Sequence, residues 1–288
     1  MTPDEIVARL WPGRDTQIAV LGGGITNHNF KVTVDGTEAY ALRIAGRDTD
    51  LLGIDRGAEY EASLGAAAVG VGPEVVRFEE GCLVTRFIPG NVVSVERMRE
   101  PDSIRRVAAT LRAVHMGPPI PARFNSFRVV ERYRETALAY GGRVPEAYAR
   151  ASEVAQQIER VRGPFPERLC HNDLLNANFI DDGERIRIVD WEYAGMGDVF
   201  FDLANFAINH ELDAAQSRLL LEAYTGSLRA QDVRALTLMR FMSDFREAMW
   251  GVVQATVSEL DFDFAGYANE HFERLARTEA SKEFRAAL

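Results

Sequence analysis

Hydrophobic and polar positions follow a period of two in the first part of the chain. Short alternating segments at residues 17–21, 29–34, 38–44, 74–78 and 82–87 predict β-strands. Asp35-Gly36 is a strong hairpin signal between the second and third of these strands. Residues 3–10 and the alanine-rich residues 54–69, which end at Gly70, predict helices. We therefore expect a mostly antiparallel sheet with one long helix inserted after the third strand.

The pattern changes after Ile88-Pro89-Gly90. Helical periodicity covers residues 101–116, 130–140, 145–162, 212–226, 231–259 and 264–279, and residues 186–189 predict one short buried strand. The expected class is α+β, with a β-rich N-terminal lobe over residues 1–87 and a larger helical lobe over residues 88–288. Ligands prefer the cleft between two such lobes, so we look for the site there.

Composition and charge argue against several kinds of binding partner and cellular compartment. The 288 residues carry a formal net charge of −10, which argues against nucleic acid and anionic membranes as partners. No run of 18 apolar residues predicts membrane insertion, and the first residues carry no secretory signal. Cys82 and Cys170 are too few for a disulfide framework, which favours a reducing, cytoplasmic compartment. A homodimer remains open.

The strongest chemical pattern is His171-Asn-Asp173, followed by Asn178 and then by Asp190 after an apolar strand. Phosphoryl transfer needs a carboxylate to accept the proton of the attacking hydroxyl, and hard oxygen ligands to hold Mg²⁺ against the phosphates of ATP. We assign Asp173 as the catalytic base and Asn178 and Asp190 as metal ligands. The alternative, a polar turn before a strand, leaves these fixed positions unexplained. His171 is interpreted as structural.

Residues 22–30, between the first two strands, are rich in glycine and small polar side chains. Backbone amides in such a loop can cover phosphates, although a glycine-rich hairpin is more often only a turn. No Walker lysine follows the glycines, and no G-x-G-x-x-G opens a helix, which argues against a P-loop and a dinucleotide fold. The candidate phosphate-covering residues are Gly24, Thr26, Asn27 and Asn29.

A strand cation paired with a helix carboxylate is the other element that kinases use to hold phosphates. Arg43 lies in the third predicted strand and Glu59 in the following helix. Only Lys31 and Lys282 are lysines, so arginine is the expected cation. The alternatives are an exposed strand arginine and a solvated glutamate, with Glu61 as a rival for the pairing.

Together these motifs resemble the choline/ethanolamine kinase family, over about residues 18–280. This family belongs to the aminoglycoside-phosphotransferase-like kinases, so the resemblance implies a two-lobed, protein-kinase-like fold that binds ATP and Mg²⁺. It also implies a hinge at Arg86, Phe87 and Ile88, where adenine contacts the backbone. Asp190-Trp-Glu192-Tyr193 and the later Trp250-Gly-Val-Val-Gln254 point to the choline/ethanolamine branch.

By the same resemblance, the substrate ammonium lies near Glu192, Tyr193, Trp250 and Phe264, since aromatic faces beside carboxylates hold quaternary ammonium groups. The sequence departs from the eukaryotic enzymes at three positions. Glu247 stands where they have a second tryptophan, Phe264 where a tyrosine is usual, and Asn209 where they have a glutamate. A cage with fewer aromatic walls discriminates poorly for a trimethylated amine.

The expected function is ATP- and magnesium-dependent phosphorylation of the hydroxyl of a small cationic amino alcohol, choline or ethanolamine first. A kinase of the same fold that acts on an aminoglycoside, thiamine or a sugar is the nearer alternative. A nucleotide-binding pseudokinase is the alternative from another class. The presence of Asp173, Asn178 and Asp190 counts against it.

Overall fold

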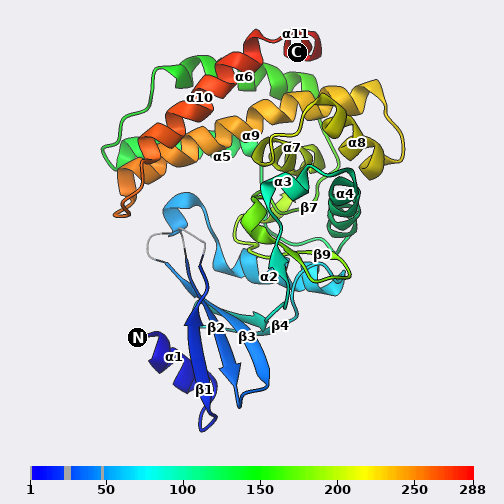
Figure 1. Cartoon of the computed structure of the whole chain (residues 1–288). Coiled ribbons are helices and arrows are strands. Elements are labelled where there is room, and N and C mark those ends of the chain that lie inside the picture. The colour runs from blue at the N-terminus through cyan, green and yellow to red at the C-terminus, as the bar shows by residue number, and fades with distance from the viewer. Residues whose placement is uncertain (1, 23–26, 47–48) are drawn as a thin grey trace.

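The computed structural model describes residues 2–22, 27–46 and 49–288, and it has a sheet at one end and helices at the other (Figure 1). Five antiparallel strands form the sheet, in the order β1-β2-β3-β5-β4. They are β1 (Thr16–Val20), β2 (Asn27–Val34), β3 (Glu38–Ala45), β4 (Val75–Glu79) and β5 (Cys82–Arg86). Each expected strand is present, and its bounds lie within two residues of the expected ones.

The β2–β3 hairpin fixes which residues face the cleft. Asp35 and Gly36 form its turn with left-handed φ values of 49° and 69°. The resulting register places Asn29 opposite Arg43, so both side chains leave the same face of the sheet. The other face packs on helix α1 (Pro3–Leu10), in a cluster of apolar residues that includes Ile6, Val7, Leu10, Val32, Val34, Leu42 and Val84.

Helix α2 (Arg56–Ala68) lies between the sheet and the helical part of the molecule (Figure 1). The Asp55 side chain begins it by accepting hydrogen bonds from the backbone N–H groups of Gly57 and Ala58. Gly70, at a φ of 69°, ends the segment. The buried residues of α2 include Glu59 and Ser63, two polar side chains that an ordinary core does not need.

Helix α9 (Ala230–Val257) runs through the helical part and makes its most extensive contacts with three other helices. Its last two-thirds are buried almost all round, which is expected for a central helix. The six expected helices are present, although α5 begins four residues earlier than expected. Besides α9, these are α4 (Pro101–His115), α5 (Ser126–Ala139), α6 (Ala147–Arg162), α8 (Ala214–Thr225) and α10 (Phe264–Ala280). Three further helices were not expected: α3 (Val95–Met98), α7 (Val199–Asn209) and α11 (Lys282–Ala287).

Two small sheets sit next to α7 and support the loops between residues 171 and 194. Strand β7 (Arg168–Cys170) pairs with β10 (Gly195–Gly197), and β8 (Phe179–Asp181) pairs with both β6 (Asn91–Val92) and β9 (Ile186–Ile188). Only β9 was expected from the sequence. The two sheets hold the intervening loops where the helical part faces the N-terminal sheet.

The hydrophobic core does not divide where the strands end. Leu52, Ile54, Ala62, Ala66 and Val71 are packed into the same core as the C-terminal helices. The backbone N–H of Ile188 also donates to the carbonyl of Val71. A boundary between residues 87 and 88 therefore stays a prediction. Across the described part of the chain, none of the helices combines the length and apolar character needed to cross a bilayer.

Candidate active site

The loop after β7 carries Asp173, and α7 holds that loop in shape. Asp202, in the first turn of α7, accepts hydrogen bonds from the backbone N–H groups of His171 (2.8 Å) and Asn172 (2.7 Å). Asn172 adopts a φ of 67°, so the loop turns sharply just before Asp173. Asp202 thus braces the loop, while Asp198 is the residue that caps the helix.

His171 has the structural role that its position in the motif suggested. Its buried ring contacts the carbonyl oxygen of Val189 through Nε2 (3.0 Å), and Nδ1 accepts from the backbone N–H of Asp173 (3.2 Å). Burial lowers the pKa of His171 below its ordinary value. The ring therefore links the loop to the segment that precedes Asp190.

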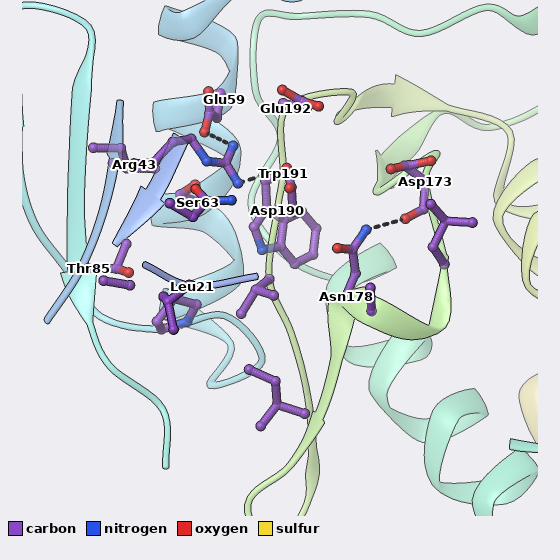
Figure 2. Close-up of a pocket in the computed structure, with 18 of the residues that line it drawn as sticks. Leu21, Arg43, Glu59, Ser63, Thr85, Asp173, Asn178, Asp190, Trp191 and Glu192 are labelled. Atoms are coloured by element: carbon purple, nitrogen blue, oxygen red, sulfur yellow. Dashed lines mark hydrogen bonds and ion pairs between the residues drawn. The ribbon is translucent and has the colours of Figure 1, made fainter. Parts of the chain in front are cut away.

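Asn178 ends a short 3-10 turn, Asn176–Asn178, and lies next to Asp173. Its amide nitrogen donates to the backbone carbonyl of Asp173 (2.8 Å), so the amide oxygen is turned away from that contact and toward the cavity (Figure 2). The motif spacing thus brings the expected base and an expected metal ligand together.

Arg43 reaches from β3 across to the helical part (Figure 2). It forms ion pairs with Glu59 of α2 and, through Nη2, with Asp190 Oδ1 at 2.7 Å. Burial opposes the charge, but the two carboxylates raise the pKa of Arg43 above its ordinary value. Glu61 is exposed, so the structure answers the question of which glutamate pairs with Arg43 in favour of Glu59.

The network includes a second arginine, Arg56, at the start of α2. Its Nη1 contacts Glu59 (2.7 Å) and Glu192 (3.3 Å), and its Nη2 donates to the side-chain oxygen of Asn27 (2.8 Å). The Asn27 amide also donates to Glu192 (2.8 Å). Sequence reasoning missed Arg56, and the structure shows that Asn27 and Glu192 meet each other rather than lying at opposite ends of the site.

These side chains surround one cavity of about 600 Å³ between the sheet and the helical part. Asn29, Arg43, Glu59, Asp173, Asn178 and Asp190 line it, together with the expected hinge residues Arg86, Phe87 and Ile88. Its walls near the hinge are apolar and include Leu21, Ala41, Leu83, Leu175, Ile180 and Val189. Gly24 and Thr26 lie outside the described residues, and Gly22 is the lining glycine of that loop.

Three of the four residues expected at the amine site line the cavity. Glu192, Tyr193 and Trp250 line the cavity, but Phe264 does not. Phe264 instead packs behind Trp250, edge to face, with ring centroids 5.7 Å apart. Two residues that were not predicted, Phe262 and Tyr267, line the cavity instead.

Sequence reasoning also missed a charged pair on α9. The Arg246 side chain is only 1% exposed. Its Nη1 lies 2.6 Å from Glu247 Oε1 and 3.3 Å from Asp173 Oδ1. Glu247 was noted only as a departure from a family pattern. Two adjacent charges within one turn of Trp250, on a helix that is otherwise mostly apolar, were the available signal.

The pKa values of the two carboxylates that share Arg246 shift in opposite directions. Desolvation in the cleft raises the pKa of Asp173 to about 7; Arg246 opposes this shift, and Glu247 and Asp190 reinforce it. Burial of Glu247 has the same tendency, but Arg246, His271 and the hydrogen bond from Tyr267 together outweigh it and hold the pKa of Glu247 below its ordinary value. At neutral pH, Glu247 is therefore an anion and Asp173 is poised to gain or lose a proton.

The donor set suits magnesium. Asn178 and Asp190 offer an amide and a carboxylate oxygen on facing loops, and Mg²⁺ prefers a few hard oxygen ligands of this kind. Asp190 Oδ1 is buried and pairs with Arg43 Nη2 at 2.7 Å. Asp190 takes a φ of 68°, a conformation that residues other than glycine rarely adopt.

Comparison with known proteins gives a consistent result. The sequence model described as "Choline/ethanolamine kinase" matches residues 18–219. A solved choline/ethanolamine kinase family protein from Mesorhizobium loti is 31% identical and superposes with a TM-score of 0.85, over 100% of this chain and 98% of that chain. This superposition confirms the expected fold class over the whole chain.

Two curated proteins show the same relationship at the level of sequence. Protein LicA of Haemophilus influenzae is 29% identical over 212 residues, which span 70% of this chain but only 61% of LicA, less than two thirds of its length. Ethanolamine kinase 2 of Rattus norvegicus is 27% identical over 91% of this chain and 77% of its own.

Proposed function

The chain belongs to the choline/ethanolamine kinase family and is a phosphotransferase; from this premise we propose that it uses ATP and Mg²⁺ to phosphorylate the hydroxyl of a small amino alcohol. Choline and ethanolamine are the first candidates. The observation that carries the proposal is that one cavity of about 600 Å³ holds Asp173, Asn178 and Asp190 together with Arg43.

The size and lining of the cavity support a nucleotide at the hinge end. A volume of about 600 Å³ lies within the usual range for small-molecule sites. The apolar walls near Phe87 and Ile88 suit a purine base, with backbone groups of the hinge as its polar contacts. Arg43, which is 13% exposed, lies deeper in the cavity and can exchange part of its pairing with carboxylates for phosphate oxygens.

At the other end of the cavity, Asp173 orients the alcohol and accepts its hydroxyl proton as the alcohol oxygen attacks the γ-phosphorus; the bond from that phosphorus to the β–γ bridging oxygen breaks, and ADP leaves. A base with a pKa of about 7 matches this task near neutral pH. Asn178 and Asp190 hold Mg²⁺, which offsets the charge of the phosphates when it is bound. The chain itself contributes mainly positioning and fixed charges, because phosphoryl transfer asks for little covalent chemistry.

A substrate panel with coupled ADP detection tests this function. With MgATP, we expect turnover of ethanolamine or choline and none of an aminoglycoside, thiamine or a simple sugar. Turnover of one of those compounds alone would assign the chain a different substrate within the same fold. Nucleotide binding without ADP release on any alcohol would indicate a pseudokinase.

The variant Asp173→Ala tests the assigned base. We expect turnover to fall by a factor of about 10² to 10⁴, which is the usual contribution of general acid–base catalysis. The melting temperature and nucleotide affinity should stay close to wild type, because the loop is held by Asp202 and not by the Asp173 side chain. Asp102→Ala, at an exposed carboxylate of α4, is the matched control and should keep full activity.

A further inference from the structure

Glu247 is a buried carboxylate beside the alcohol end of the cavity. It lines the cavity next to Trp250 and is 3% exposed. Its Oε1 contacts Arg246, and its Oε2 accepts a hydrogen bond from the Tyr267 hydroxyl (2.9 Å). Because Arg246 holds its pKa low, Glu247 presents a negative charge to whatever occupies this end of the cavity.

Arg246 removes one aromatic wall from the same region. Its guanidinium carbon lies over the ring of Tyr193, 4.4 Å from the ring centroid. That ring face is therefore already occupied by a cation. Trp250 and Tyr267 meet edge to face, so one of these rings covers a face of the other, and Phe262 is 50% exposed.

Glu192, the carboxylate first expected to face the ammonium, has other partners. It accepts hydrogen bonds from Asn27 and contacts Arg56, and both belong to the N-terminal part of the chain. Glu247, by contrast, shares Arg246 Nη1 with Asp173, so it is the carboxylate joined directly to the proposed base.

The spacing of the two carboxylates suits a short amino alcohol. Asp173 and Glu247 both contact the same nitrogen, Arg246 Nη1, at 3.3 Å and 2.6 Å. A hydroxyl directed to Asp173 and an ammonium directed to Glu247 must therefore be close to one another in the ligand. Two carbons between oxygen and nitrogen, as in a 2-amino alcohol, satisfy this requirement.

A carboxylate and an aromatic cage select different ammonium groups. A primary ammonium replaces its lost water contacts with N–H donors to a carboxylate, whereas a quaternary ammonium has no N–H and depends on ring faces. A site that offers a carboxylate and few free faces is selective for the first kind, because hydrogen-bonding sites reject analogues that lack the donor.

We propose that Glu247, held in place by Arg246, is the specificity-determining residue of this site and selects 2-amino alcohols whose ammonium retains N–H groups over quaternary ones. This inference rests on the proposed function and narrows it.

The wild-type protein provides the first test. The kcat/KM is measured with MgATP on ethanolamine and its mono-, di- and trimethylated derivatives, the last of which is choline. We expect kcat/KM to fall along the series, with ethanolamine favoured over choline at least about tenfold, since a hydrogen bond to a charged group is lost. Equal or better turnover of choline overturns the inference while the proposed function stands.

Glu247→Gln identifies the residue responsible. The amide keeps the shape but removes the charge, so we expect the ethanolamine-to-choline ratio to fall at least about fivefold. The matched control is Asp244→Asn, which neutralises another buried carboxylate one turn earlier on α9 that contacts His271 and Arg274 and does not line the cavity. It should keep the wild-type ratio.

The remaining outcomes are also decisive. A wild-type preference for ethanolamine that Glu247→Gln leaves unchanged overturns the assignment to Glu247. If Glu247→Gln does not fold, the wild-type methylation series still decides between the two kinds of ammonium. Absence of turnover on all four amines contradicts the proposed function itself, and with it the inference.

Discussion

The two ends of the cavity are built around the same unit, an arginine that bridges two carboxylates. At the nucleotide end, Arg43 joins Glu59 to Asp190; at the alcohol end, Arg246 joins Glu247 to Asp173. In each case nearby carboxylates raise the pKa of the arginine although burial opposes the charge. The shared unit shows that each end uses a fixed cation to set the position of an acidic side chain.

The two units differ in their access to the cavity. Arg43, on β3, is 13% exposed, and its partners come from α2 and the loop after β9, so it connects the two parts of the molecule. Arg246 is 1% exposed and pairs with its own neighbour in sequence. We conclude that an incoming anion can compete for Arg43, while Arg246 is a permanent part of the cavity wall.

Replacing Arg246 is expected to have the largest effect. Arg246→Met leaves Glu247 buried without its cation, and removing one member of a buried ion pair costs about 3–5 kcal/mol. Urea unfolding should show this loss in the free energy of unfolding. The double variant Arg246→Met/Glu247→Leu should recover a large part of it, because both charges are then absent. Equal stability of the single variant and the wild type would mean that the two arginine units do not differ in this way.

Arg43→Met should affect binding rather than folding. Glu59 keeps its contact with Arg56, and Asp190 is 17% exposed and can turn to water, so the change in unfolding free energy should be the smaller of the two. The dissociation constant of MgADP should rise about tenfold to a hundredfold, the equivalent of a charge-assisted contact with phosphate. Calorimetric titration measures this change. An unchanged dissociation constant would remove Arg43 from the nucleotide end.

Glu59 and Glu61 offer a matched pair on one helix. Glu59→Gln weakens the hold on Arg43 and should lower kcat/KM for ATP about tenfold, the equivalent of one hydrogen bond between charged groups. Glu61→Gln changes an exposed position two residues away and should stay within about twofold of wild type. Similar losses in both variants would show that the charge of α2, and not the specific pair, is what matters.

The nucleotide end could be predicted from the sequence to a much greater extent than the alcohol end. Asn178 and Asp190 lie at fixed spacing in the short segment that follows Asp173, and Arg43 and Glu59 follow from the order of strand and helix. The register of β2 and β3 also follows from a three-residue turn. Local patterns of this kind are set by backbone geometry, so they are readable without knowing how distant elements pack.

The alcohol end depends on packing between distant elements. Arg246 meets Asp173 across 73 residues of sequence, and only the rotation of α9 in the core decides that it faces the cavity. Phe262 and Phe264 are equally apolar, and the turn before α10 decides that only Phe262 lines the cavity. Strands such as β7 and β8 have three residues each, which is too short for an alternating pattern to appear.

The smallest expected effect is a shift in the pH dependence of kcat/KM, which we expect Asp173 to set. A protonated Asp173 cannot accept the hydroxyl proton, so kcat/KM should rise with pH and level off above about 7, the pKa of this group. The charge of Glu247 contributes to raising that pKa, so Glu247→Gln should move the rise to lower pH, while Asp244→Asn should leave it in place. Rate measurements across pH 5 to 9, on wild type and both variants, locate the midpoint. A midpoint that stays fixed in Glu247→Gln would show that Glu247 does not contribute to the pKa of Asp173 and that the two carboxylates around Arg246 act independently.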